Sequence, residues 1–197
     1  VDDKEKANLF NEFFLKASSI DDSRAEIPNS AIGTSIGPVL DNISITYNDV
    51  KDQIDILKCN KAYGHDEISP IFLKEGGAAV IAVLHKLFSL SLEQNKFPDM
   101  WKYANIIPLH KKDSMNVVSN YRPVSLLCVA SKVFERIIFK SVFNFFRDNF
   151  VISDFQSGFQ TGKSTTTQLL ELYHQFCKAV DNGKEIKSCF LRHKESF

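Results

Sequence analysis

The stretch W-K-Y-A-N-I-I-P-L-H-K-K-D-S-M-N-V-V-S-N-Y-R-P-V-S-L-L, residues 101–127, contains two apolar runs that are separated by a polar link. The runs cover residues 104–109 and 123–127. Apolar runs of this length, bounded by turn-forming residues, are typical of strands, and two in succession predict a β-hairpin with a long loop.

Cations flank this predicted hairpin. Lys102 precedes it, Lys111 and Lys112 end its first arm, and Arg122 begins its second arm. Arginine can bind two anion oxygens at once and lysine supplies a mobile point charge, so these side chains suit an anion with several phosphates. The alternative is a solvated hairpin tip, and these residues alone leave both interpretations open.

The composition is that of an ordinary globular protein with a sizeable core. The chain has 197 residues, of which 44% are hydrophobic and 24% charged, enough for one large domain or two small ones. It carries 24 Lys or Arg and 24 Asp or Glu, so the overall basic charge that favours nucleic-acid binding is absent. Residues 101–140, however, hold seven bases and two acids, which predicts a basic face in the middle of the chain.

The cysteines are far apart and form no C-x-x-C pair; they are Cys59, Cys128, Cys177 and Cys189. This spacing predicts free thiols with no disulfide partner, in an intracellular compartment, either nucleus or cytoplasm. The first residues are charged and lack an apolar core, so no signal peptide is expected. No apolar run is long enough to cross a bilayer, and no membrane partner is expected.

Helical periodicity and capping residues predict a helix-rich chain. The expected helices are 2–18, one capped by Thr46, one beginning at Ser69-Pro70, 78–93, one capped by Ser131 and reaching about 149, and one capped by Ser164 and ending before Asn182-Gly183. A strand is predicted over Glu185–Leu191. Residues 19–45 are expected to be a linker or a wrapping arm, and His85 a satisfied or half-exposed histidine.

Gly162-Lys163-Ser164 resembles the end of a phosphate-binding loop, but the spacing is wrong. Ser157 stands where that loop needs glycine, and Gly158 is one residue too close. The simpler prediction is that Ser164 caps a helix and that Lys163 faces solvent or a phosphate backbone near the helix N-terminus. The chain has no H-E-x-x-H or G-x-S-x-G motif, so spacing alone assigns no enzyme activity.

Five stretches together resemble, in order and spacing, the reverse transcriptases of non-LTR (LINE-type) retrotransposons. They are K-A-Y-G-H-D-E-I-S-P (61–70), F-P-D-M-W-K-Y-A-N-I-I-P (97–108), N-Y-R-P-V-S-L-L (120–127), F-Q-S-G-F (155–159) and G-K-S-T (162–165). F-N-E-F-F (10–14) is similar to the segment that precedes them in the family. The resemblance covers nearly the whole chain.

The resemblance implies a helix-rich α+β fold, the fingers subdomain of a reverse transcriptase with a β-hairpin and the first strand of the palm. It divides the chain into an N-terminal helix and linker (1–45), a fingers region (46–184) and a first palm strand with a broken end (185–197). The intact parent would carry out RNA-directed DNA synthesis with an RNA template, a DNA primer, deoxynucleoside triphosphates and Mg²⁺.

The resemblance also implies roles for particular residues. Lys111, with Lys112 as an alternative, and Arg122 would hold the triphosphate of the incoming nucleotide. Residues expected near the template and primer are Lys61, Gly64, Asp66, Gln156, Gly158 and Lys163.

The last residues depart from the family. Its first catalytic motif reads F-L-D-I-S-K-A-F-D, and Arg192 stands at the position of the leading Asp. Mg²⁺ requires oxygen ligands, so no catalytic residue and no catalytic metal are expected here. One set of codons that encodes residues 192–197 is CGA-CAT-AAG-GAA-AGC-TTT. Without its first base this set reads GAC-ATA-AGG-AAA-GCT-TT, or Asp-Ile-Arg-Lys-Ala, which nearly restores the motif and gives the hypothesis of a frameshifted end.

The family's second catalytic motif, Tyr-x-Asp-Asp, does not occur in the 197 residues. The chain is therefore predicted to be a reverse transcriptase fragment that is inactive alone. The alternatives are a non-catalytic module that binds RNA or an RNA–DNA hybrid, and a non-functional translated remnant.

Overall fold

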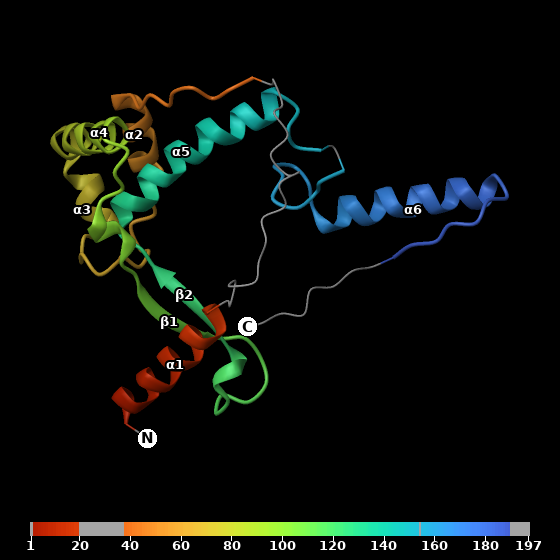
Figure 1. Cartoon of the computed structure of the whole chain (residues 1–197), viewed down its shortest axis with the longest axis horizontal. Coiled ribbons are helices and arrows are strands. Elements are labelled where there is room, and N and C mark those ends of the chain that lie inside the picture. The colour runs from red at the N-terminus through yellow and green to blue at the C-terminus, as the bar shows by residue number, and fades with distance from the viewer. Residues whose placement is uncertain (1, 20–37, 154, 190–197) are drawn as a thin grey trace. The chain divides into compact units, whose positions relative to one another are not determined.

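The structure is a computed structural model that describes residues 2–19, 38–153 and 155–189. It divides into two compact units, one up to Asn144 and one from Phe145 onward, and each is described here by itself. The elements in chain order are α1 (Asp3–Ser18), α2 (Tyr47–Asp55), α3 (Pro70–Glu75), α4 (Gly77–Glu93), η2 (Asp99–Lys102), β1 (Asn105–His110), η3 (Val118–Asn120), β2 (Tyr121–Leu126), α5 (Val129–Asp148) and α6 (Thr165–Asp181) (Figure 1). The chain is therefore helix-rich, with one small antiparallel sheet, and the predicted α+β class is confirmed at this level.

The helices begin where the sequence placed their capping residues, with one exception. Thr46 accepts a hydrogen bond from the backbone N–H of Asp49, 3.1 Å away, and Asp49 accepts one in return from the backbone N–H of Thr46. Ser69 caps α3, and Ser164 caps α6 with a reciprocal contact from Thr167. Such side-chain acceptors satisfy the N–H groups that a helix leaves unpaired in its first turn.

The exception is Ser131, which was predicted to cap a helix. The helix α5 already begins at Val129, and Ser131 lies in its first turn with no exposed surface. Its hydroxyl donates to the carboxylate of Glu135, 2.8 Å away, one turn further on. Burial of residues 128–131 in the core starts the helix before the residue that local preference would choose, since tertiary packing overrides weak local preference.

The core of the first unit lies between α2, α4 and the first turns of α5. Phe88 of α4 is fully buried, and its ring centroid lies 5.0 Å from Phe134 and 5.7 Å from Trp101. His85, on the same helix, is half-buried, and its Nε2 lies 3.0 Å from the carbonyl oxygen of Ile45. The predicted satisfied histidine is confirmed.

The hairpin forms as predicted, and its two prolines occupy positions that cost no backbone hydrogen bond. The backbone N–H of Lys111 donates to the carbonyl oxygen of Asn120 at 2.8 Å, which marks a hydrogen-bonded pair. Hydrogen-bonded and non-hydrogen-bonded pairs alternate along an antiparallel ladder. The Pro108–Pro123 pair is three pairs away from Lys111–Asn120, so it is a non-hydrogen-bonded pair. At a non-hydrogen-bonded position the backbone N–H points away from the partner strand. Proline has no N–H, so here it costs no bond within the hairpin and also discourages pairing with a further strand.

In the second unit, α6 does not bury the apolar side that the sequence predicted to face inward. None of its residues is buried, and Leu169, Tyr173 and Val180 are all more than 60% exposed. The predicted inward set was Leu169, Leu172, Tyr173, Phe176, Ala179 and Val180. An amphipathic helix becomes buried only against another element. Apart from the last turn of α5 (residues 145–148), the described residues of this unit include no helix or strand to cover it.

The strand predicted over Glu185–Leu191 is wrong for its described part. Residues 185–189 form no strand, and residues 190 and 191 lie outside the described residues. A strand needs a neighbour for its backbone N–H and C=O groups, and none pairs with this segment in the described part of the chain.

None of the described helices is long and apolar enough to cross a membrane.

Candidate functional site

The strand register places the two predicted phosphate-binding residues on one face of the hairpin. Arg122 is paired with Leu109, and the backbone bond from Lys111 to Asn120 continues the same register by one more pair. Side chains two residues apart on a strand share a face, so Lys111 lies on the same face as Leu109 and its partner Arg122. Lys111 and Arg122 are thus diagonal neighbours across the two strands, a pair that is usually about 7–8 Å apart. We call this surface the cation face; besides the two cations it carries Ile107, Leu109 and Val124.

The opposite face of the hairpin is occupied by α1. A groove of about 940 Å³ lies between this helix and the hairpin residues Ile106, Pro108, Pro123 and Ser125. At its end the ring of Phe10 meets that of Tyr121 edge-on, with centroids 4.8 Å apart. α1 lies on this side of the hairpin and not on the cation face, where Ile107, Leu109 and Val124 are exposed; on the α1 side Ile106 also keeps 49% of its surface exposed.

The polar link between the strands is ordered by its own hydrogen bonds. The Nε2 of His110 lies 3.1 Å from the carbonyl oxygen of Asp113, and the amide of Asn120 donates to the carbonyl oxygen of Ser114 at 2.9 Å. The hydroxyl of Tyr121 donates to the carbonyl oxygen of Met115 at 3.0 Å. These bonds fix the end of β1 and the start of β2, where the two cations are attached.

The three cations at this end of the hairpin differ in their surroundings. Arg122 is exposed and makes no ion pair within the part of the chain that the structure describes. Lys111 is half-buried and already has an interaction partner. Lys112 is exposed and lies one residue beyond the paired strands. Of the two cations on the cation face, Arg122 is therefore the more available to an anion.

The predicted template residues of the first unit lie near the other end of the hairpin. Gly64 is buried against the backbone of Leu127 and Cys128, just after β2, whereas Lys61 is exposed. Asp66 accepts a hydrogen bond from the backbone N–H of Ile68 at 3.3 Å. Gly64 contacts residue 127, five residues from Arg122, so it lies roughly 17 Å along the strand from that side chain. The structure joins Gly64 to the base of the hairpin, away from the cation face.

The remaining predicted residues belong to the second unit. The amide of Gln156 donates to the carbonyl oxygen of Gly158 at 3.4 Å, and Lys163 is exposed beside the cap of α6. No atom lies within 4 Å of a Cβ placed on Gly158, so packing does not require glycine there. Arg192 lies outside the described residues. Within the described ranges, no group of three or more His, Cys, Asp or Glu is arranged to hold a metal ion.

Sequence reasoning missed a contact between His65 and Cys128. The Sγ of Cys128 lies 3.8 Å from the Nδ1 of His65, and the thiol donates to the carbonyl oxygen of Met100 at the same distance. Burial raises the pKa of the Cys128 thiol, and the hydrogen bond to Asp66 raises it further, so the thiol stays protonated at neutral pH. The apolar run around Cys128 predicts its burial, but no local signal predicts its partner 63 residues away.

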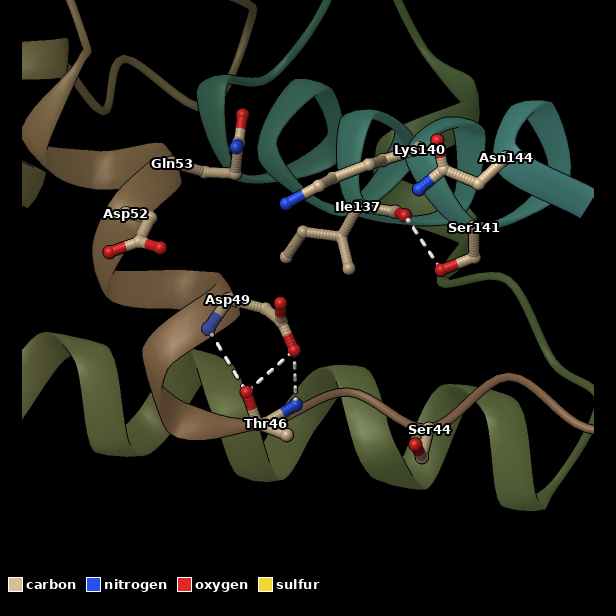
Figure 2. A pocket seen from close by; sticks show the side chains of 9 residues that line it. All are labelled: Ser44, Thr46, Asp49, Asp52, Gln53, Ile137, Lys140, Ser141 and Asn144. Carbon is tan, nitrogen blue, oxygen red and sulfur yellow. Dashed lines mark hydrogen bonds between the residues drawn. The ribbon is translucent and has the colours of Figure 1, made fainter. Parts of the chain in front are cut away.

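A separate polar pocket of about 270 Å³ lies between α2 and α5 (Figure 2). It is lined by Ser44, Thr46, Asp49, Asp52, Gln53, Ile137, Lys140, Ser141 and Asn144. The hydrogen bond from Thr46 is the main cause that lowers the pKa of Asp49, and the charge of Lys140 adds to it. None of the residues predicted to bind nucleotide or template lines this pocket. The hydrogen bonds drawn in it are those of the α2 cap and one from the Ser141 hydroxyl to the carbonyl oxygen of Ile137 within α5 (Figure 2).

Comparison with known proteins identifies the family. The chain matches no known protein-family model. It is 33% identical over 139 residues to the probable RNA-directed DNA polymerase from transposon X-element of Drosophila melanogaster, an alignment that covers 70% of this chain and 15% of that protein. The chain belongs to the reverse transcriptases of non-LTR retrotransposons. The resemblance drawn from the five sequence motifs is confirmed.

Two further relatives extend this match along the reverse transcriptase chain. The probable RNA-directed DNA polymerase from transposon BS of Drosophila melanogaster is 28% identical over 154 residues, covering 78% of this chain and 17% of that protein. The RNA-directed DNA polymerase from mobile element jockey of Drosophila funebris is 26% identical over 192 residues, covering 97% of this chain and 21% of that protein. This reverse transcriptase chain thus spans about 15 to 21% of the length of these relatives.

Proposed function

We propose that this chain is the fingers region of a non-LTR reverse transcriptase, and that its cation face binds the triphosphate of a deoxynucleoside triphosphate. The observation that carries the proposal is the register, which sets Lys111 and Arg122 side by side on the face that α1 leaves open. The resemblance of the N-Y-R-P motif to the family supports the same assignment.

The cation face offers both kinds of contact that a nucleotide needs. The guanidinium of Arg122 can donate two parallel hydrogen bonds to phosphate oxygens. The ammonium of Lys111 adds a positive point charge at the end of a flexible side chain. Between them and the base of the hairpin lie the exposed side chains of Ile107, Leu109 and Val124. These provide an apolar surface against which a sugar or a base can pack without competing for the cations.

Nucleic acid would bind elsewhere on the chain. The exposed Lys61, on the loop that also carries Gly64 and Asp66, is positioned to contact an RNA template backbone. In the second unit, Phe155 and Phe159 are almost fully exposed and lie in the same segment as Lys163. Exposed aromatic rings beside a cation suit stacking on unpaired bases, which favours RNA or RNA–DNA hybrid binding as a second candidate function.

The residues present do not fit a catalytic magnesium site. The relatives are RNA-directed DNA polymerases, and the family implies Mg²⁺ at its first catalytic motif. At that motif position this chain has Arg192, whose guanidinium is a cation with no oxygen to donate to a metal. The proposed role of this chain is therefore to bind nucleotide and template without polymerising.

The chain alone is expected to show no polymerase activity. Purified protein mixed with an RNA template, a labelled DNA primer, Mg²⁺ and the four deoxynucleoside triphosphates should leave the primer at its original length on a denaturing gel. The variant Arg192→Asp should be equally inactive, because restoring one carboxylate does not supply the missing Tyr-x-Asp-Asp pair. Primer extension that follows the protein through purification, and that disappears in Arg122→Ala, would contradict this part of the proposal.

A further inference from the structure

The loop that carries Lys61 and Asp66 is fastened to the hairpin through a backbone contact at Gly64. A Cβ atom on Gly64 would lie 2.5 Å from the backbone nitrogen of Cys128 and 2.7 Å from the carbonyl carbon of Leu127. Both neighbours are main-chain atoms, which cannot turn aside as a flexible side chain can. Gly64 is not among the residues with positive φ, so the need for glycine here is a need for space.

The same junction also reaches the first strand of the hairpin. The ring of His65 packs edge-on against Tyr103, with centroids 5.6 Å apart, and Tyr103 lies two residues before β1. The thiol of Cys128, two residues after β2, donates to the carbonyl oxygen of Met100 in η2. Consecutive loop residues thus contact the chain at the base of both strands.

The junction is continuous with the hydrophobic core. Cys128 has no exposed surface and Val129 is 2% exposed, so the start of α5 is anchored directly behind Gly64. The Nε2 of His65 is buried and has no hydrogen-bond partner among the described residues, so packing and the contact of Nδ1 with the Cys128 thiol hold the ring. A loop seated on the core in this way moves with the base of the hairpin.

We propose that Gly64 and His65, seated on Cys128, are positioning residues that fix the hairpin relative to the template loop, so that RNA on the loop and triphosphate on the cation face bind cooperatively. This inference rests on the proposed function, because it assumes that each surface has its ligand. Energetic coupling between two sites is reciprocal: RNA should strengthen triphosphate binding by the same factor by which triphosphate strengthens RNA binding.

The coupling is measured on the full chain with a labelled single-stranded RNA oligonucleotide and a deoxynucleoside triphosphate. Each dissociation constant is determined with and without a saturating amount of the other ligand. In the wild-type chain we expect a coupling factor of at least about 5, the lower end of the usual range. In Gly64→Ala the factor should fall to about 1, whereas each ligand alone should still bind. Val83→Ala, which truncates a side chain that is 66% exposed on α4, is the control and should keep the wild-type factor.

A second readout tests the junction without any ligand. In a chain whose other cysteines are replaced by serine (Cys59, Cys177 and Cys189), iodoacetamide can label only Cys128. Labelling should be slow in this background and at least about tenfold faster after Gly64→Ala, because local opening exposes buried groups. If Gly64→Ala does not fold, His65→Ala, which only removes a half-buried ring, should weaken both protection and coupling.

The outcomes separate the two proposals. Triphosphate and RNA that both bind the wild-type chain, but independently of each other, would overturn the positioning role and leave the proposed function intact. Retained coupling together with retained protection of Cys128 in Gly64→Ala would overturn the junction itself. A wild-type chain that binds no triphosphate would contradict the proposed function, and the positioning role with it, even if Cys128 stays protected.

Discussion

Replacing Phe88 by alanine should destabilise the first unit by about 3–5 kcal/mol, the usual cost of truncating a fully buried phenylalanine. The ring has no exposed surface and packs against both Trp101 and Phe134. Its removal loses the transfer free energy of the ring and leaves a cavity between α4 and α5 that the surrounding helices only partly fill. Since small domains are stable by roughly 5–15 kcal/mol, a loss of this size brings the unit close to unfolding.

Urea denaturation followed by tryptophan fluorescence measures this effect, because Trp101 is the single tryptophan of the chain and is 7% exposed. Phe72→Ala is the matched control: that side chain is 61% exposed on α3, and its truncation should change stability by no more than about 0.5 kcal/mol. Equal effects of the two substitutions would show that the core is not centred on Phe88.

Replacing Arg122 by alanine should weaken binding of a deoxynucleoside triphosphate by roughly 10- to 100-fold. Hydrogen bonds to charged groups contribute about 1.5–3 kcal/mol each, and every 1.4 kcal/mol is a factor of ten in affinity. Arg122→Lys keeps the charge but loses the paired hydrogen bonds, so its loss should be intermediate. Added salt should reduce the wild-type affinity and narrow the gap between wild type and variant.

Isothermal titration of the wild-type and variant chains measures this loss directly. Arg136→Ala provides the control, since it removes one exposed arginine from α5, away from the cation face, with the same change in net charge. An equal loss in both variants would indicate diffuse attraction by the basic region and not a site on the hairpin. Unchanged affinity in Arg122→Ala would remove this residue from the site.

The parts of the fold that depend on residues close together in the sequence could be predicted from the sequence. Thr46 with Asp49, and Ser164 before its helix, act through hydrogen bonds within one turn, so the residues themselves specify the cap. The hairpin followed from two apolar runs around a polar link. Ser131 failed as a cap because the start of α5 is buried in the core, which no local pattern reports.

The parts of the site that depend on contacts between segments far apart in the sequence could not be predicted. The sequence named both Lys111 and Arg122, but only the strand register shows that they share the face that α1 leaves open. Gly64 was placed near a template because of its motif, whereas its structural role is to let the loop approach Leu127 and Cys128. That approach joins residues more than 60 positions apart, and neither periodicity nor spacing encodes it.

The most direct test of the cation face is a titration of the isotope-labelled chain with a deoxynucleoside triphosphate, followed residue by residue through amide chemical shifts. Binding as proposed should shift Leu109, Lys111, Arg122 and Val124 in a saturable way, with much smaller changes at Ile106 and Ser125, which point toward α1. The same shifts should be absent in Arg122→Ala. Saturable shifts on the α1 side of the hairpin, or no saturable shifts on either side, would contradict the assignment of the cation face as the nucleotide site.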